Sequence, residues 1–203
     1  MEIVHSFTPL PSALLLPDER SIPLYAQIEA AIRSYGFSIK QDYVGFYEVQ
    51  EGDTLHKYPK AGTFDGIHIA ISPDLSNSER CFDALHLFGH SVTFASDSYQ
   101  NVINRFTHTP EMDPSFFPTL LEYEFLAARF GLALLHQLAV NDIDRWYTDF
   151  VYTDHKMVET SYKNGGNVPS FADCVVTGMP LVEPMAIPSD VKPILLPNER
   201  IAY

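Results

Sequence analysis

Two histidines, His86 and His90, stand four residues apart in the segment ALHLFGH, which spans residues 84–90. If the segment is helical, this spacing places both imidazoles side by side on one face. Two imidazoles in that arrangement can bind one divalent metal ion at about 2.0–2.1 Å, as in helical zinc sites that use a pair of histidines at this spacing. Such pairs also arise by chance, so a metal site needs further ligands from elsewhere in the chain.

The two histidines belong to a polar stripe on an otherwise apolar helix, which the sequence predicts from about Asn77 to Ala95. A capping-box pattern formed by Ser76 and Glu79 marks its start. Polar residues recur along it at intervals of four and three positions, and we call this set the histidine stripe: Glu79, Asp83, His86, His90, Thr93 and Asp97. A helix this apolar is mostly buried, so the stripe must face water, a polar partner or a bound ion. The simplest alternative is the solvated edge of an amphipathic helix.

A second long helix is predicted from about Phe117 to Ala139, and it supplies a carboxylate. On the helical wheel Glu124 has only apolar or small neighbours: Leu120, Ala127, Ala128, Gly131, Leu134 and Leu135. A carboxylate on such a face needs a partner or a proton, and the small neighbours allow another helix to approach closely. We therefore predict that Glu124 shares a cation with His86 and His90. The alternative is a Glu124 that is exposed or paired with Arg or Lys.

These two segments together resemble the ImmA/IrrE-type zinc metallopeptidases of bacteria and phage. Residues 72–90 are similar to that family's strand, loop and helix leading into H-E-[FL]-G-H. Residues 124–135 are similar to its helix with the pattern E-x-x-A-[ND]-x-F-A-x-x-L-L. The resemblance implies a zincin-like fold in which His86, His90 and Glu124 bind zinc.

One departure from the family pattern bears on catalysis. The general-base glutamate that follows the first histidine in the family is Leu87 here, and a leucine can neither accept nor donate a proton. In such hydrolases that carboxylate takes a proton from the zinc-bound water and passes it to the leaving amine, so its loss should lower the rate about 10²–10⁴-fold. The second motif also has Ala128 and Gly131 in place of Asn/Asp and Ala. We therefore predict a metal site without ordinary peptidase activity.

If the protein is an enzyme, another proton acceptor must come from elsewhere in the chain. Asp83, one helical turn before His86 on the histidine stripe, is the predicted catalytic residue. Further candidates, which the sequence does not place, are Tyr123, His108, Asp154 and His155. For the last three of these, an ordinary surface position is the favoured interpretation.

Three functions are compatible with these residues. The first is a metal-dependent enzyme acting on a small molecule or peptide, with zinc as the expected ion and iron(II) as the alternative, since two histidines and one carboxylate suit both. The second is a pseudopeptidase that acts as a binding or regulatory module. The third is an inert structural protein whose histidines bind no metal. We favour the first, because burying Glu124 without a function would be costly.

The remaining elements must position these helices. With 203 residues, of which 46% are hydrophobic, the sequence predicts a packed core in one domain, residues 1–203. An N-terminal helix capped by Ser21 is expected to run to about Tyr35, and a shorter helix is expected near 142–151. Together with three strands, these helices indicate an α+β fold. The expected strands lie near 37–39, 43–49 and 66–72, with a loop before the third.

The resemblance covers residues 67–135, within a metallopeptidase-like core of about 21–151. A proline-rich tail, about 164–203, is expected to wrap over this core in extended segments, because its prolines exclude a long helix or a central strand.

Charge and composition exclude several classes of partner. The net charge of −13 gives a surface that repels phosphate backbones, so we expect no nucleic-acid partner. No apolar run approaches the roughly 18 residues that span a bilayer, so we expect no membrane partner. Two cysteines do not form a disulfide framework, which favours a cytoplasmic protein.

Overall fold

The structure is a computed structural model, and it describes residues 2–3, 9–51, 54–108, 115–163, 169–195 and 201–202. It is an α+β protein in which helices predominate. The described residues include five α-helices: α1 (Asp18–Ser34), α2 (Asn77–Ala95), α3 (Gln100–His108), α4 (Phe116–Gln137) and α5 (Asp144–Lys163). Three short 3-10 helices accompany them: η1 (Ser12–Leu14), η2 (Asp97–Tyr99) and η3 (Phe171–Cys174).

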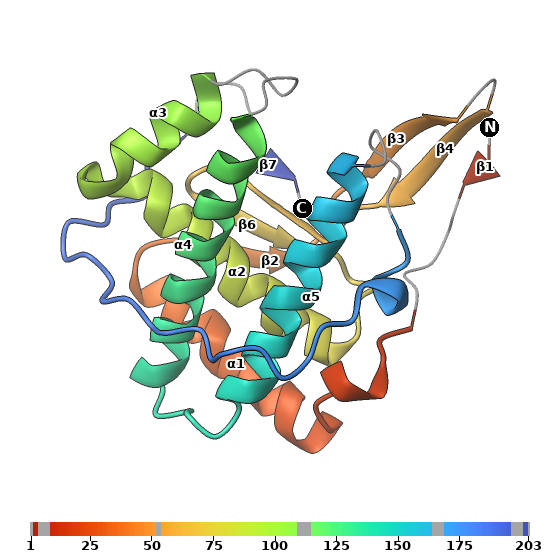
Figure 1. Cartoon of the computed structure of the whole chain (residues 1–203). Coiled ribbons are helices and arrows are strands. Elements are labelled where there is room, and N and C mark those ends of the chain that lie inside the picture. The colour runs from red at the N-terminus through yellow and green to blue at the C-terminus, as the bar shows by residue number, and fades with distance from the viewer. Residues whose placement is uncertain are drawn as a thin grey trace.

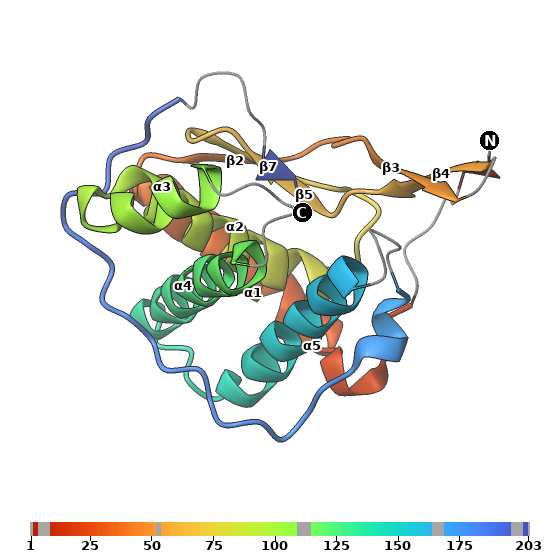
Figure 2. The ribbon, with the colours of Figure 1, turned by 45° about the horizontal axis from the view of Figure 1, so that its top comes forward.

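The strands form two small sheets. The larger has the order β2–β6–β5–β7, with the bounds Ser38–Gln41, His68–Ile71, Gly62–Phe64 and Ile201–Ala202. The smaller has the order β1–β4–β3, with the bounds Glu2–Ile3, Thr54–Pro59 and Phe46–Glu51. In the larger sheet β2 pairs in parallel with β6 and places Ile39 opposite Ile69, whereas β5 is antiparallel to β6. Figure 2 shows α2, α4 and α5 on one side of this sheet, with β3 and β4 reaching away from the helices.

The helix that carries the two histidines has the bounds that the sequence predicts. The capping box is formed in both directions, since Ser76 Oγ accepts from the Glu79 amide and the Ser76 amide donates to Glu79 Oε2 at 2.7 Å. This cap fixes where α2 starts and therefore which side chains share a face. The first helix, in contrast, begins at Asp18, before the predicted cap. Ser21 lies inside it, and its hydroxyl donates to the Pro17 carbonyl instead.

The predicted bounds of several other strands and helices are wrong. The predicted loop before the third strand contains β4 and β5. The sequence does not predict the nine residues of α3, since this polar segment has few apolar positions; Val102 and Ile103 are buried with Tyr123. The last helix extends twelve residues past Val151 to Lys163, because its buried face continues.

Close approach of α2 and α4 depends on two glycines. A Cβ on Gly89 would lie 2.0 Å from the carbonyl oxygen of Ala127, and a Cβ on Gly131 would lie 2.8 Å from the carbonyl oxygen of Leu85. These helices are therefore in backbone contact, as the small residues around Glu124 predict. Gly89 lies against Ala127, and Leu85 lies against Gly131. Higher numbers on α2 therefore meet lower numbers on α4, and the two helices run in opposite directions.

The proline-rich tail runs along the outside of the helices (Figure 1). Its backbone amides are bound at successive points: Val182 by Thr148 Oγ1, Met185 by the carbonyl of Arg129, and Lys192 by the carbonyl of Ala95. The segment 175–195 contains no helix or strand. Within the described residues, every helix is too short or too polar to cross a bilayer.

Candidate metal centre

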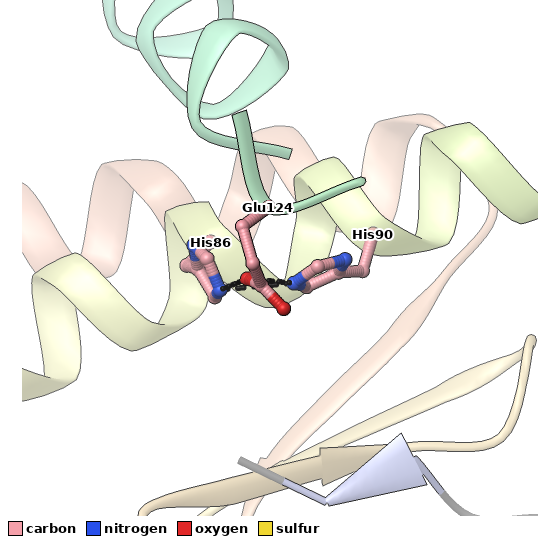
Figure 3. Close-up of side chains that lie close together, drawn as sticks. All are labelled: His86, His90 and Glu124. Carbon is pink, nitrogen blue, oxygen red and sulfur yellow. Dashed lines mark hydrogen bonds and ion pairs between the residues drawn. The ribbon is translucent and has the colours of Figure 1, made fainter. Parts of the chain in front are cut away.

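His86 and His90 lie on the face of α2 that packs against α4, and Glu124 reaches them from α4 (Figure 3). The Nε2 atoms of the two histidines are 2.9 Å apart. Glu124 Oε2 lies 3.0 Å from Nε2 of His86 and 3.1 Å from Nε2 of His90. All three side chains are almost completely buried. We call these three residues the histidine–glutamate cluster, and they are the residues that the sequence predicts as metal ligands.

Hydrogen bonds among the two Nε2 atoms and Glu124 Oε2 cannot all be favourable when Glu124 is ionised. If both Nε2 atoms carry protons and donate to the carboxylate, two N–H groups face each other at 2.9 Å. If one of them lacks its proton, its lone pair faces the carboxylate oxygen at about 3 Å. One cation bound by all three lone pairs removes the conflict. Ligand atoms bound tetrahedrally to one zinc ion at 2.0–2.1 Å lie roughly 3.3–3.4 Å apart, close to the observed separations.

The protonation of the cluster is set by burial and by mutual charge. Burial works against the ionised carboxylate, but the charge of His90 and the hydrogen bonds from both histidines hold the pKa of Glu124 well below its usual range. Burial also disfavours a charged His86, yet the hydrogen bond and charge of Glu124 raise the pKa of His86. At His90 burial prevails and lowers the pKa to about 4. Ionised Glu124 and neutral His90 are the forms in which these side chains bind a metal.

Aromatic rings hold the imidazoles in place. Phe82 stacks on His86 with ring centroids 5.5 Å apart, and Phe64 stacks on His90 at 6.1 Å. The Tyr123 ring lies 4.2 Å from that of His90. These contacts fix the orientation of both potential ligands and keep the local dielectric low, which strengthens the attraction for a cation.

Leu87, the residue after the first histidine, packs on the sheet. A Cβ on Gly62 of β5 would lie 2.5 Å from Leu87 Cδ1, and the Leu87 side chain is 1% exposed. This position therefore anchors α2 to β5 and provides no proton acceptor.

Asp83, the catalytic residue predicted from sequence, lies one turn before His86 and is partly buried. Burial and the charge of Glu79 raise the pKa of Asp83 well above its usual range. Its catalytic role stays a prediction.

Tyr123 is fully buried, and His108 lies in α3, with its side chain outside the described residues.

The surface interpretation is wrong for His155, whose side chain is 6% exposed, and Asp154 beside it is partly buried. Burial raises the pKa of Asp154 to about 6, while the charges of His86 and Glu124 also act on it. The burial of His155 could be predicted only from a helix that continues past Val151. In such a helix the buried face carries residues at intervals of four, namely Tyr147, Val151 and His155.

Comparisons with protein-family models, with curated proteins and with solved structures found no match. The fold and the site therefore define the class: an α+β protein with a buried group of two histidines and one glutamate that could hold a metal ion.

Proposed function

We propose that this protein is a metal-dependent enzyme on a metallopeptidase-like, zincin-like scaffold. His86, His90 and Glu124 would hold one divalent ion, zinc in the first instance and iron(II) as the alternative. The observation that carries the proposal is the buried convergence of their three ligand atoms within 3.1 Å of one another. Such an ion supplies Lewis acidity and lowers the pKa of a bound water.

The ligand number supports an enzyme over a structural metal site. Structural zinc sites are generally closed by four protein ligands, whereas catalytic sites use three and leave one position for water or substrate. Among the residues that the structure describes, the cluster offers three side chains. Asp83 lies on the same face of α2 as His86 and His90, and it remains a proposed catalytic residue. The net charge of −13 favours a neutral or cationic substrate, either a small molecule or a peptide.

A pseudopeptidase that binds without turnover is the second candidate, and Leu87 is the observation that favours it. The residue that would be the general base in the metallopeptidase pattern is buried against β5 and is apolar. An enzyme therefore needs a different proton acceptor.

Metal content tests the proposal directly. Protein purified without a histidine tag, stripped with chelator and dialysed against zinc should hold about one equivalent by elemental analysis. His86→Ala and Glu124→Gln should each weaken zinc binding more than about 100-fold, because losing a ligand exceeds the 10–100-fold cost of losing a supporting residue.

His136→Ala is the matched control. His136 also lies on α4 and contacts a carboxylate, that of Asp144, but this pair is partly exposed. The control should bind zinc like the unaltered protein. A chain that takes up neither zinc nor iron(II) in stoichiometric amounts would refute the proposal, as would equal losses in the His136→Ala and His86→Ala proteins.

A further inference from the structure

We propose that α5 completes the site, with Asp154 as the acid–base residue that Leu87 cannot be. This inference rests on the proposed function and adds to it a reaction class, the hydrolysis of an acyl compound such as an amide or ester. The argument depends on how three helices are aligned at the histidine–glutamate cluster.

The first step concerns helix direction. Along α4 and α5, Tyr147 Oη donates to the carbonyl of Ala128 at 3.0 Å, and the His155 ring lies 4.6 Å from that of Phe125. Increasing numbers on α5 thus meet decreasing numbers on α4, and these helices are antiparallel. Because α2 is also antiparallel to α4, α2 and α5 run in the same direction on either side of the cluster.

The second step fixes the register of α2 and α5. Phe82 of α2 stacks on Phe150 of α5, with ring centroids 4.1 Å apart. His86 follows Phe82 by four residues and Asp154 follows Phe150 by four. Residues four apart lie one turn along the same face of a helix. Asp154 of α5 is therefore level with His86 of α2, and each of these two groups feels the charge of the other.

The third step concerns buried polar atoms near this end of α5 that lack hydrogen-bond partners among the described residues. His155 is buried, and neither of its ring nitrogens has a hydrogen-bond partner among the residues that the structure describes. Its ring packs on Phe125, the residue after Glu124, and the charges of Glu124 and His86 both act on it. Buried polar atoms of this kind are normally satisfied, so a water or ligand is expected at this position.

Three groups lie near the cluster, and their positions separate them. Asp83 precedes His86 by one turn on α2 itself, and the ring of His155 packs on Phe125. The stacking of Phe82 on Phe150 places Asp154 of α5 level with His86. Burial also raises the pKa of Asp154 to about 6, toward the range in which a carboxylate both accepts and returns a proton.

The proposed step is an ordinary hydrolysis. The Asp154 carboxylate accepts one proton from a water molecule bound in the site, and the water oxygen forms a bond to the carbonyl carbon of the substrate. The bond from that carbon to nitrogen or oxygen then breaks. The proton passes from Asp154 to the departing atom, which leaves as an amine or alcohol. No oxidant or reductant is required.

The test uses acetohydroxamic acid as a probe on the zinc-loaded protein. To chelate a metal, a hydroxamic acid must give up a proton. Titration calorimetry at pH 7 in two buffers of different ionisation enthalpy counts the protons that reach the buffer. In the unaltered protein Asp154 should keep the proton, so that roughly none is released, whereas Asp154→Asn should release about one. Hydrolysis of 4-nitrophenyl acetate should fall about 10²-fold in the variant.

Two further variants make the result interpretable. Glu159→Gln removes the same charge from a partly exposed position further along α5, where it pairs with Lys156 and Lys163, and should match the unaltered protein in both measurements. Asp154→Glu should restore part of the hydrolysis. An Asp154→Asn protein that binds zinc, releases no extra proton and hydrolyses the ester normally would overturn the inference while leaving the proposed function intact. Loss of zinc from that variant would also overturn it, since Asp154 would then be a ligand. If the unaltered chain binds no metal, the proposed function itself fails.

Discussion

Helix α4 carries two histidine–carboxylate contacts that are alike in distance and different in surroundings. Near its start, Glu124 lies 3.0 and 3.1 Å from His86 and His90, with all three side chains at most 4% exposed. At its end, His136 lies 2.9 Å from Asp144, with side chains 29% and 23% exposed. Water can complete the hydrogen bonds of the second pair but not those of the first. The same pairing of residue types is therefore a weak surface contact between His136 and Asp144, whereas the buried groups around Glu124 require a further partner.

What separates the two regions is the approach of the backbones. At the buried end, α2 and α4 touch through Gly89 and Gly131, so no side chain can hold the helices apart and admit solvent. At the exposed end, the contact bridges α4 and the start of α5 near a turn. Burial, rather than the pairing of residue types, thus makes the histidine–glutamate cluster a candidate site.

Gly89→Ala should have the largest effect on this contrast. The added Cβ would lie 2.0 Å from the Ala127 carbonyl oxygen, and a backbone atom cannot move away as a flexible side chain can. We expect the free energy of unfolding to fall by about 3 kcal/mol or more. Zinc affinity should fall as well, because Glu124 is carried away from the histidines. Urea denaturation and a zinc titration measure the two effects.

Gly45→Ala is the control for this substitution. Gly45 has a φ of +92°, but no other atom of the described residues lies within 4 Å of the place that an added methyl group would take, so the change introduces backbone strain without a clash. It should cost about 1 kcal/mol and leave zinc affinity unchanged. Unaltered zinc affinity in the Gly89→Ala protein would show that close approach of α2 and α4 is not what builds the site.

His155→Phe should have the next largest effect, and it depends on pH. The pKa of His155 is about 4 in the folded chain and 6.5 in the unfolded chain, because burial opposes its charge. As pH falls below 6.5 the unfolded state gains a proton that the folded state does not, so His155 destabilises the fold increasingly down to about pH 4. Removing it should make the zinc-free variant more stable relative to the unaltered protein by about 2–3 kcal/mol at pH 4.5 compared with pH 7.

Urea denaturation at the two pH values measures this difference. Phe125→Leu changes the packing around the same ring without removing a titratable group, so its effect on stability should be similar at both pH values. If the advantage of His155→Phe does not grow on acidification, His155 is not buried in a neutral form.

The sequence was sufficient to predict the histidine–glutamate cluster but not the position of α5 beside it. His86, His90 and Glu124 could be predicted because helical periodicity and small neighbours are local properties, and the capping box at Ser76 fixed the phase of α2. The contribution of α5 could not be predicted in the same way. It depends on the stacking of Phe82 on Phe150, a contact between residues far apart in the chain.

The strands show a second kind of limit. β5 has three residues, too few for an alternating pattern to be recognised, and it is held by pairing with β6. Its Gly62 provides the space that Leu87 fills. Leu87 stands where the metallopeptidase pattern that the sequence resembles has a glutamate. The structural reason for an apolar residue there becomes visible only when α2 and β5 are packed together.

Asp144→Asn should have the smallest effect, and it tests the exposed end of the comparison. The substitution removes the charge that faces His136 while keeping a side chain of the same shape. Because both side chains are partly solvated, the free energy of unfolding should fall by less than about 1 kcal/mol, and the difference should shrink as salt is added. Glu124→Gln makes the same chemical change at the buried end, where it should cost several times more in zinc-free protein, since the buried His86 loses its counter-charge. Equal costs at the two ends, measured by urea denaturation at low and high salt, would mean that burial does not distinguish them.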